Sequence, residues 1–226
     1  MKKLLGLIAV LTFLTVGSFA QADHHEATLT VIHGISGLPE PVDVYADGNF
    51  LFSFDFNESV DNIPLPPASY FIEVKLMGDT VLSGTATLEE GKNYTAIAHF
   101  TFDDSGDNAI RASSTPGIRL SFFENNVTDL RRWAIRLTLR HTADAPEVDV
   151  ALRRGIWGAA FFGKALGLSN NDSGNPGQFG PVDFWWGNFT AVFFPAGTDT
   201  EVFNSGLLKL KRGYHYIVYP IGSIFD

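Results

Sequence analysis

Hydrophobic and polar residues alternate along most of this chain with a period of two residues. From Phe50 the sequence reads FLFSFDFN, so its four phenylalanines share one side of an extended segment and mostly polar residues lie on the other. This alternation predicts a half-buried β-strand. Further extended runs begin at Tyr70, Tyr94 and Ile118, and Gly, Pro and Asp-Gly turn signals separate the runs at short intervals. We therefore predict an all-β chain of short antiparallel strands packed as sandwiches.

One pattern occurs twice, about half the chain apart. The sequence is TVIHGISGLPEPVDVYADG from Thr30 and LTLRHTADAPEVDVALRRG from Leu137. In both copies a β-rich run ends in a histidine, a loop containing proline follows, and Val-Asp-Val begins the next strand. The paired residues are His33 with His141 and Asp43 with Asp149.

A second shared element has the form Leu-x-x-Gly-x-x-Tyr. It contains Gly91 and Tyr94 in the first copy, and Gly213 and Tyr216 in the second. Self-similarity at this distance predicts two copies of one domain. We place tandem immunoglobulin-like β-sandwiches at residues 23–128 and 129–226.

The first 22 residues have the composition of a secretory signal peptide. Lys2 and Lys3 precede an apolar run that ends in Ala20-Gln21-Ala22, an A-x-A cleavage pattern. The run is shorter than the roughly 20 apolar residues that a spanning helix needs, so we expect cleavage after Ala22. The mature chain then has no transmembrane span, and we expect it in the periplasm or at the cell surface.

The second copy differs from the first in two ways. We expect a Gly-rich apolar insertion at about 156–180, with its NNDSGNPGQFG segment forming a loop. The second copy also ends soon after Tyr216, whereas the first continues beyond Tyr94 to a further strand from Ile118. This predicts a missing strand and an open sheet edge, which invites another chain to pair with it. A short tail or the insertion can instead cover that edge, and we favour this alternative.

Composition narrows the functional classes. The chain has no cysteine, which excludes disulfides, thiol catalysis and cysteine zinc sites. The net charge of −9 becomes −11 without Lys2 and Lys3, which argues against a nucleic-acid partner. Nucleotide-binding and metalloprotease motifs are absent from the sequence, as is a serine nucleophile elbow. We expect no enzyme activity.

The repeated motifs resemble a bacterial family of exported proteins, the domain-of-unknown-function family numbered 4397. The resemblance rests on HTADAPEVDV from His141 and on the Leu-x-x-Gly-x-x-Tyr element that ends at Tyr216. The first copy keeps His33 and Val-Asp-Val-Tyr but has a longer loop without Asp-Ala. The resemblance implies an immunoglobulin-like or transthyretin-like sandwich, often in tandem, with no assigned reaction.

His33 and His141, with Asp43 and Asp149 as partners, are the candidate catalytic residues. An active site is rarely needed identically in both halves of a chain, whereas a hydrogen bond that holds a turn is. We therefore assign all four residues a structural role.

Two segments carry candidate metal ligands. Cleavage after Ala22 would expose Asp23-His24-His25, whose amine, backbone amides and imidazole can form a square-planar site for Cu(II) or Ni(II). Asp103, Asp104 and Asp107 form an acidic turn with oxygen ligands suited to Ca2+, although it lacks the complete loop of a calcium site. Solvated chain is the favoured interpretation of both segments, so we expect no cofactor.

Trp185 and Trp186 are candidate glycan ligands, because adjacent strand residues point to opposite faces and one can be exposed. We favour a core or inter-domain role for this pair. Taken together, these features predict a non-enzymatic structural or protein-interaction module of the bacterial envelope, able to self-associate through an open edge of its second domain. The alternative is a protein that binds a glycan or copper.

Overall fold

The computed structural model describes residues 10–16, 26–39, 41–102, 117–154, 160–170, 177–185 and 187–223. Every regular element in these ranges is a β-strand, which confirms the all-β prediction. In the described part of the chain, no helix is long and apolar enough to cross a bilayer. The chain forms two compact units. The first unit contains residues 19–100 and 117–128, and the second contains residues 1–18, 101–116 and 129–226.

The first unit contains two four-stranded sheets. One has the strand order β5-β2-β8-β9 and the other β4-β3-β6-β7. Strands β2 and β8 run parallel, and every other pair in the unit is antiparallel. The bounds are β2 Ala27–His33, β3 Val42–Ala46, β4 Asn49–Phe54, β5 Ser59–Leu65, β6 Ala68–Leu76, β7 Asp79–Leu88, β8 Asn93–Phe100 and β9 Ile118–Asn125.

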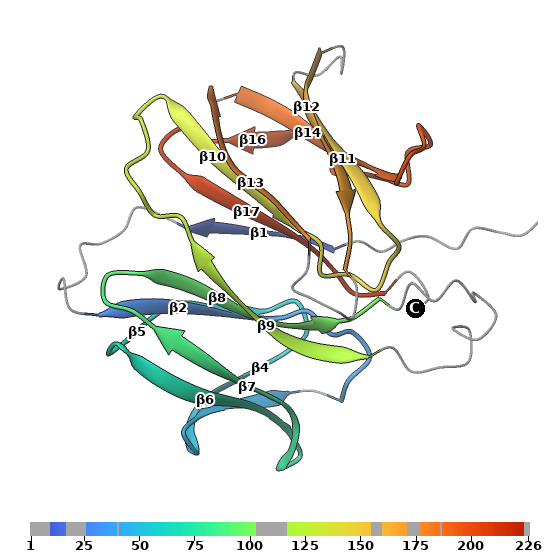
Figure 1. Cartoon of the computed structure of the whole chain (residues 1–226). Helices are drawn as coiled ribbons and strands as arrows, with labels where there is room; N and C mark the ends of the chain where they lie inside the picture. The colour runs from blue at the N-terminus through green and yellow to red at the C-terminus, as the bar shows by residue number, and fades with distance from the viewer. Residues whose placement is uncertain are drawn as a thin grey trace, which may run out of the picture. The chain divides into compact units, whose positions relative to one another are not determined.

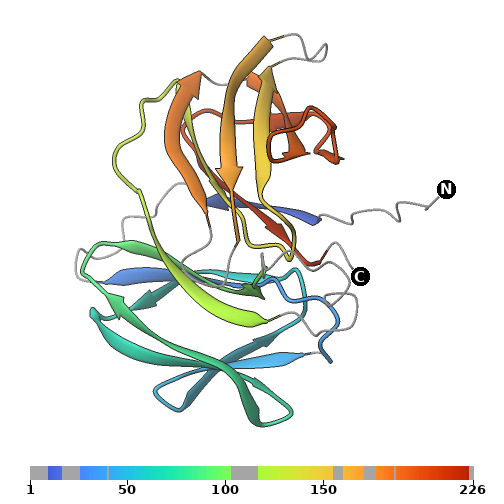
Figure 2. The ribbon, with the colours of Figure 1, turned by 45° about the vertical axis from the view of Figure 1, so that its right-hand side comes forward.

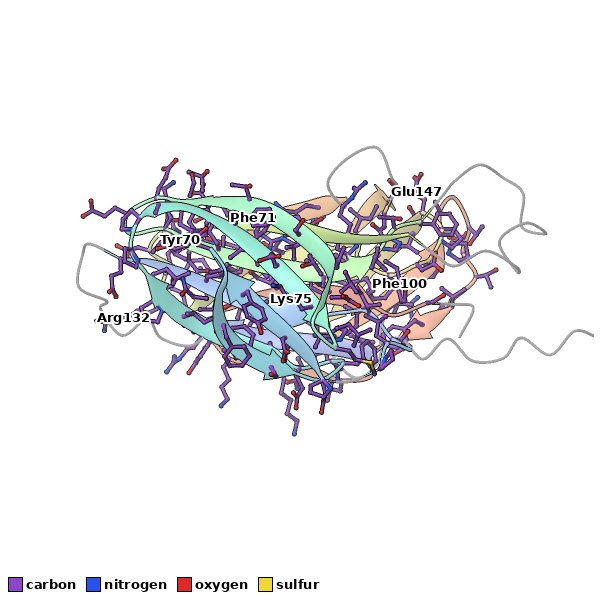
Figure 3. The ribbon with its side chains drawn as sticks, turned by 90° about the horizontal axis from the view of Figure 1, so that it is seen from below. Tyr70, Phe71, Lys75, Phe100, Arg132 and Glu147 are labelled. Carbon is purple, nitrogen blue, oxygen red and sulfur yellow. The ribbon has the colours of Figure 1, made fainter. Side chains whose placement is uncertain are left out.

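The core of the first unit draws side chains from both sheets. Leu29 and Ala96 come from one sheet, Val44 and Ile72 from the other, and all four are at most 1% exposed. Alternation along the strands places these residues on one face, as the hydrophobic pattern predicts. Figure 3 shows Tyr70, Phe71 and Lys75 along strand β6. Phe71 is exposed, and Tyr70 and Lys75 are half-buried.

The phenylalanine-rich segment departs from its predicted pattern. Its strand ends at Phe54, and a register shift between Val44 and Tyr45 interrupts its pairing with β3. Phe50 is consequently 55% exposed and packs edge-on against the Tyr45 ring. The irregular pairing breaks the strict alternation, so the four phenylalanines do not form one buried face.

The second unit also contains two sheets. Their orders are β1-β17-β10-β13 and β12-β11-β14-β15, with β16 paired to β14 beside β15. Its bounds are β1 Val10–Val16, β10 Ala134–Arg140, β11 Val148–Arg154, β12 Ala160–Leu168, β13 Gln178–Trp185, β14 Gly187–Pro195, β15 Phe203–Asn204, β16 Leu208–Leu210 and β17 His215–Ile221. A separate core includes Ile135, Val150, Phe189 and Val218.

Strand pairing in the second unit repeats that of the first. Strand β10 lies between β13 and β17 as β2 lies between β5 and β8, and β11 lies between β12 and β14 as β3 lies between β4 and β6. Strands β10 and β17 are parallel, like β2 and β8. Part of the segment expected as an insertion, 156–180, forms strands: β12 takes the place that β4 has in the first unit, and β13 begins at Gln178. The pairing of β12 with β11 places this segment in a sheet, which periodicity alone did not indicate.

Candidate functional site

Strand β17 is an interior strand of its sheet only because β1 lies beside it. On one side, β17 pairs in parallel with β10, from Arg136 opposite His215 to Leu139 opposite Val218. On the other side, it pairs antiparallel with β1 along its whole length, from Val10 opposite Ile221 to Val16 opposite His215. Figure 1 shows β1 in blue next to β17 in red. All seven residues of β17 are buried in this arrangement.

Strand β1 takes the position that β9 occupies in the first unit. Strand β9 borders β8 at the end of the order β5-β2-β8-β9, and β1 borders β17 at the end of the corresponding order. The chain after Tyr216 supplies no such strand among the described residues, and Ser223 forms an isolated β-bridge with Asp144. The segment at 160–168 pairs with β11 in the other sheet. Within the described ranges, β1 covers the β17 edge, and neither the tail nor residues 160–168 do so, unlike the alternative favoured above.

The Leu-x-x-Gly-x-x-Tyr element builds the same corner in both units. In the first, the Tyr94 hydroxyl accepts a hydrogen bond from the backbone N–H of Glu89 at 3.2 Å. In the second, the Tyr216 hydroxyl accepts one from the N–H of Lys211 at 2.7 Å, five residues before it as in the first unit. Burial raises the pKa of Tyr216 above its ordinary value, which keeps the phenol neutral. A tyrosine bonded to backbone upstream of its strand is a known corner in β-sandwiches.

The glycine of each element turns the chain between two strands. Gly91 has φ of 69° and Gly213 has φ of 79°, a backbone region that side chains disfavour. The N–H of Gly91 donates to the carbonyl of Glu26, just before β2. The N–H of Gly213 donates at 2.7 Å to the carbonyl of Ala134, the first residue of β10. These contacts give the repeated residues a structural role.

In the first unit, His33 bonds to the backbone of Ile35 and Asp43 bonds to the side chain of Ser53. The His33 ring is 1% exposed, and its Nδ1 accepts from the N–H of Ile35 at 3.3 Å. The same ring lies 5.5 Å from that of Phe54. Asp43 accepts a hydrogen bond from the Ser53 hydroxyl at 2.5 Å, across the β3–β4 pair. These contacts fix the end of β2 and the pairing of β3 with β4.

His141 and Asp149 bond to backbone in the second unit. The His141 Nε2 donates to the carbonyl of Pro146 at 3.0 Å, which ties together the ends of its loop. Burial lowers the pKa of His141 to about 4, and the bond to Pro146 opposes this only in part. Asp149 is 3% exposed and accepts from the N–H groups of Gly167 at 3.0 Å and Gly197 at 3.1 Å. A neutral buried imidazole and a carboxylate bonded to turn amides are features of a structural corner.

Trp185 is an exposed aromatic, not a core residue. It is 56% exposed and stacks on Trp133, with ring centroids 4.2 Å apart and planes inclined by 23°. The Arg131 guanidinium carbon lies 5.5 Å from the centroid of the Trp133 ring. We favoured a core or inter-domain role for the tryptophan pair, whereas Trp185 is exposed and stacks on Trp133. Trp186 lies outside the described residues.

Both units contain rows of buried polar side chains that the hydrophobic pattern did not predict. In the second unit, the Thr138 hydroxyl lies 3.0 Å from Nε2 of His215, and Arg140 bonds to the Tyr219 hydroxyl. Burial lowers the pKa of the Arg140 guanidinium. In the first unit, the Asn125 amide donates to Asn93 at 2.6 Å and to Thr95 at 2.9 Å. Polar residues alternate with core residues along β8, and this alternation is the sequence signal that could have indicated the buried polar row.

The predicted metal ligands are not described by the structure. Asp23, His24 and His25 lie outside the described residues, and so do Asp103, Asp104 and Asp107. In the remainder that the structure does describe, no three His, Cys, Asp or Glu side chains gather into a group that could hold a metal ion.

Comparison with known proteins identifies the family. The family model DUF4397, a domain of unknown function, matches residues 27–151, more than half of the chain. The chain belongs to the DUF4397 family. The matched DUF4397 region spans every strand of the first unit, all of β10 and the start of β11.

Other comparisons add little to the DUF4397 assignment. No curated protein matches the chain. A solved structure described as "The Bacillus anthracis TIE protein" aligns with 86% of this chain at 9% identity and a TM-score of 0.26. The chain spans 50% of the length of that protein. A likeness this remote supports no inference about function.

Proposed function

We propose that this DUF4397 protein is an exported, non-enzymatic module of the bacterial envelope that binds another protein chain through the edge of β17. The mature protein then consists of two DUF4397 sandwiches in tandem, the second of which lacks its own edge strand. Self-association of mature chains is one form of this activity. The leader-like composition of the first 22 residues supports export.

The observation that carries the proposal is the origin of the strand beside β17. Strand β1 lies entirely within the segment whose composition is that of a signal peptide. Cleavage after Ala22 removes it, and the N–H and C=O groups that β17 directs toward β1 then lose their partners. An unpaired sheet edge recruits extended segments of other chains, because backbone groups there seek hydrogen bonds.

A matched pair of proteins tests the proposal. The first is the chain secreted through its own leader and purified after processing. The second carries Ala20→Leu and Ala22→Leu, which remove the small residues that cleavage needs, so that β1 stays attached. Light scattering after size-exclusion chromatography should show association of the processed chain with itself or with a co-purified protein, and a monomer for the uncleaved chain. A processed chain that stays monomeric and partner-free at high concentration would count against the proposal.

A second candidate function is glycan binding at the tryptophan stack. Trp185 exposes more than half of its surface while Trp133 supports its other side, an arrangement that suits stacking against a sugar ring. A glycan array with the processed protein tests this function. Trp185→Ala should abolish binding, and Phe71→Ala, at another exposed aromatic residue, should leave it unchanged. An array without a hit would remove this candidate.

A further inference from the structure

Strands β9 and β1 meet their neighbours in the same register. Tyr94 and Tyr216 are the matching tyrosines of the two corners. Tyr94 lies opposite Glu124 of β9, and Tyr216 lies opposite Thr15 of β1. Counting back from these pairs places Phe122 opposite Ala96 and Phe13 opposite Val218, at equivalent positions.

This register aligns two similar sequences. By register, Leu120-Ser121-Phe122-Phe123 of β9 corresponds to Leu11-Thr12-Phe13-Leu14 of β1. The pattern Leu-Ser/Thr-Phe occurs only at these two places in the 226-residue sequence. Two segments distant in sequence therefore present the same residue types to equivalent edges.

The first unit shows what the shared residues do. Leu120 and Phe122 are half-buried and pack against the core, whereas Ser121 lies on the opposite face and bonds to His99 at 2.8 Å. The Phe122 ring lies directly over Gly84 of β7, where an added Cβ would be 2.9 Å from Cε2 of the ring. Gly84 precedes Leu88 by four residues, and Gly206 precedes Leu210 by the same spacing. The environments of the two glycines differ, however, because Gly206 lies between β15 and β16 with φ of 66° and has nothing within 4 Å of an added Cβ.

We infer that the β17 edge of the mature protein is a sequence-selective acceptor for a donor strand from a different protein. The donor is an uncharged extended segment of about seven residues that pairs antiparallel with β17 and carries Leu-Ser/Thr-Phe followed by Phe or Leu. It takes the place of β1 after the leader is removed, with its phenylalanine opposite Val218. This inference rests on the proposed function, and it adds the direction, register and side chains of the bound strand.

A different protein is the expected donor because the mature chain has no spare copy of the pattern. Residues 23–226 contain Leu-Ser/Thr-Phe once, at Leu120. That copy is already paired with β8 along the eight residues of β9. If β9 left β8 to pair with the β17 edge of a second chain, the β8 edge of the donor would be exposed. The number of paired strands would therefore stay the same.

Synthetic peptides added to the processed wild-type protein test the inference directly. The probe is VLTFLTV, residues 10–16, with solubilising lysines at both ends and a fluorophore for anisotropy. We expect saturable binding to the processed protein and none to the uncleaved Ala20→Leu, Ala22→Leu chain, whose β1 already occupies the edge. Replacing the peptide phenylalanine by alanine should weaken binding at least about tenfold, because Phe122, at the equivalent register position of the first unit, packs against the core. A scrambled peptide of the same composition is the control.

N-methylation of the peptide backbone distinguishes strand pairing from nonspecific hydrophobic binding. An edge-docked strand uses the N–H groups of alternate residues only. Peptides N-methylated at residues 11, 13 and 15, or at 12 and 14, should therefore differ, with one set inactive and the other close to the parent. Equal effects of the two sets, equal binding of the scrambled peptide, or no binding would each overturn the inference.

The outcomes separate this inference from the proposed function. If the processed chain associates with itself or with another protein and the VLTFLTV peptide does not block this association, the proposed function stands and the donor-strand inference is wrong. Peptide binding to a processed chain that remains monomeric supports the acceptor and removes self-association. Retention of the leader in the secreted protein, read from its intact mass, would overturn the inference because the edge would stay occupied.

Discussion

The Tyr216 hydroxyl accepts a hydrogen bond from the backbone N–H of Lys211 at 2.7 Å, and the equivalent bond joins Tyr94 to Glu89 in the other unit. Tyr216 is 4% exposed and Tyr94 is 8% exposed. Each tyrosine thus connects the turn at its glycine to the first residues of a central strand. The repeated Leu-x-x-Gly-x-x-Tyr spacing is the sequence counterpart of this corner.

Tyr216→Phe should lower the free energy of unfolding of the second unit by about 1–2 kcal/mol, because the Lys211 N–H loses its partner while the ring still fills its place. Urea denaturation of the purified chain measures this change. Tyr214→Phe is the matched control, since Tyr214 is only half-buried and contributes its ring to the same cluster. An unchanged midpoint for Tyr216→Phe would show that the bond does not stabilise the corner.

The depressed pKa of His141 predicts a dependence of stability on pH. In the unfolded chain the imidazole takes up a proton below about pH 6.5, whereas the buried ring resists protonation until about pH 4. The stabilising contribution is complete above pH 6.5, falls as the pH drops toward 4, and levels off below that value. The difference amounts to about 3 kcal/mol at about 1.4 kcal/mol per pKa unit.

Comparing the wild type with His141→Gln isolates this contribution, because glutamine can still donate to Pro146 but does not titrate. The unfolding free energy of the variant should vary less between pH 4 and 6.5. Parallel pH profiles for the two proteins would contradict the assignment.

The ion pair between Arg136 and Asp183 joins β10 to β13. Arg136 donates from Nε to one carboxylate oxygen at 2.6 Å and from Nη2 to the other at 2.9 Å. The hydrogen bonds from Arg136 hold the pKa of Asp183 below its usual value, so the pair stabilises at neutral pH and loses its effect as Asp183 is protonated in acid. Because the Asp183 side chain is 43% exposed, solvent screens the pair.

A double-mutant cycle with Arg136→Met and Asp183→Asn should give a coupling energy of about 1 kcal/mol at neutral pH and low salt. The coupling should fall in high salt and disappear when Asp183 is protonated. A coupling independent of salt and pH would point to packing instead of charge.

Gly84 is where β7 makes room for Phe122. Gly84→Ala places a Cβ 2.9 Å from the ring of Phe122, closer than real contacts allow, and should destabilise the first unit by about 1–3 kcal/mol. Adding Phe122→Leu should recover part of the loss. Ser83→Ala, at the neighbouring exposed position, is the control, and thermal unfolding is the measurement. Equal melting temperatures for Gly84→Ala and Ser83→Ala would show that the ring yields freely.

Local patterns indicated much of the fold and part of the candidate site. Extended runs from Tyr70, Tyr94 and Ile118 became β6, β8 and β9, and the repeated glycine and tyrosine marked the two corners. The same reasoning placed residues 160–168 in an insertion and did not predict that they form β12. Their apolar residues at odd and even positions carry no period that distinguishes a strand from other buried chain.

The sequence by itself determined the all-β character, the turns and the two corners, because side-chain alternation and glycine conformation act over a few residues. Only the tertiary structure decided which strand borders β17, and in which register. Backbone hydrogen bonds at a sheet edge are the same for every residue type, so the partner is selected by the packing of side chains far away in the chain. That selection places Phe13 where the first unit places Phe122.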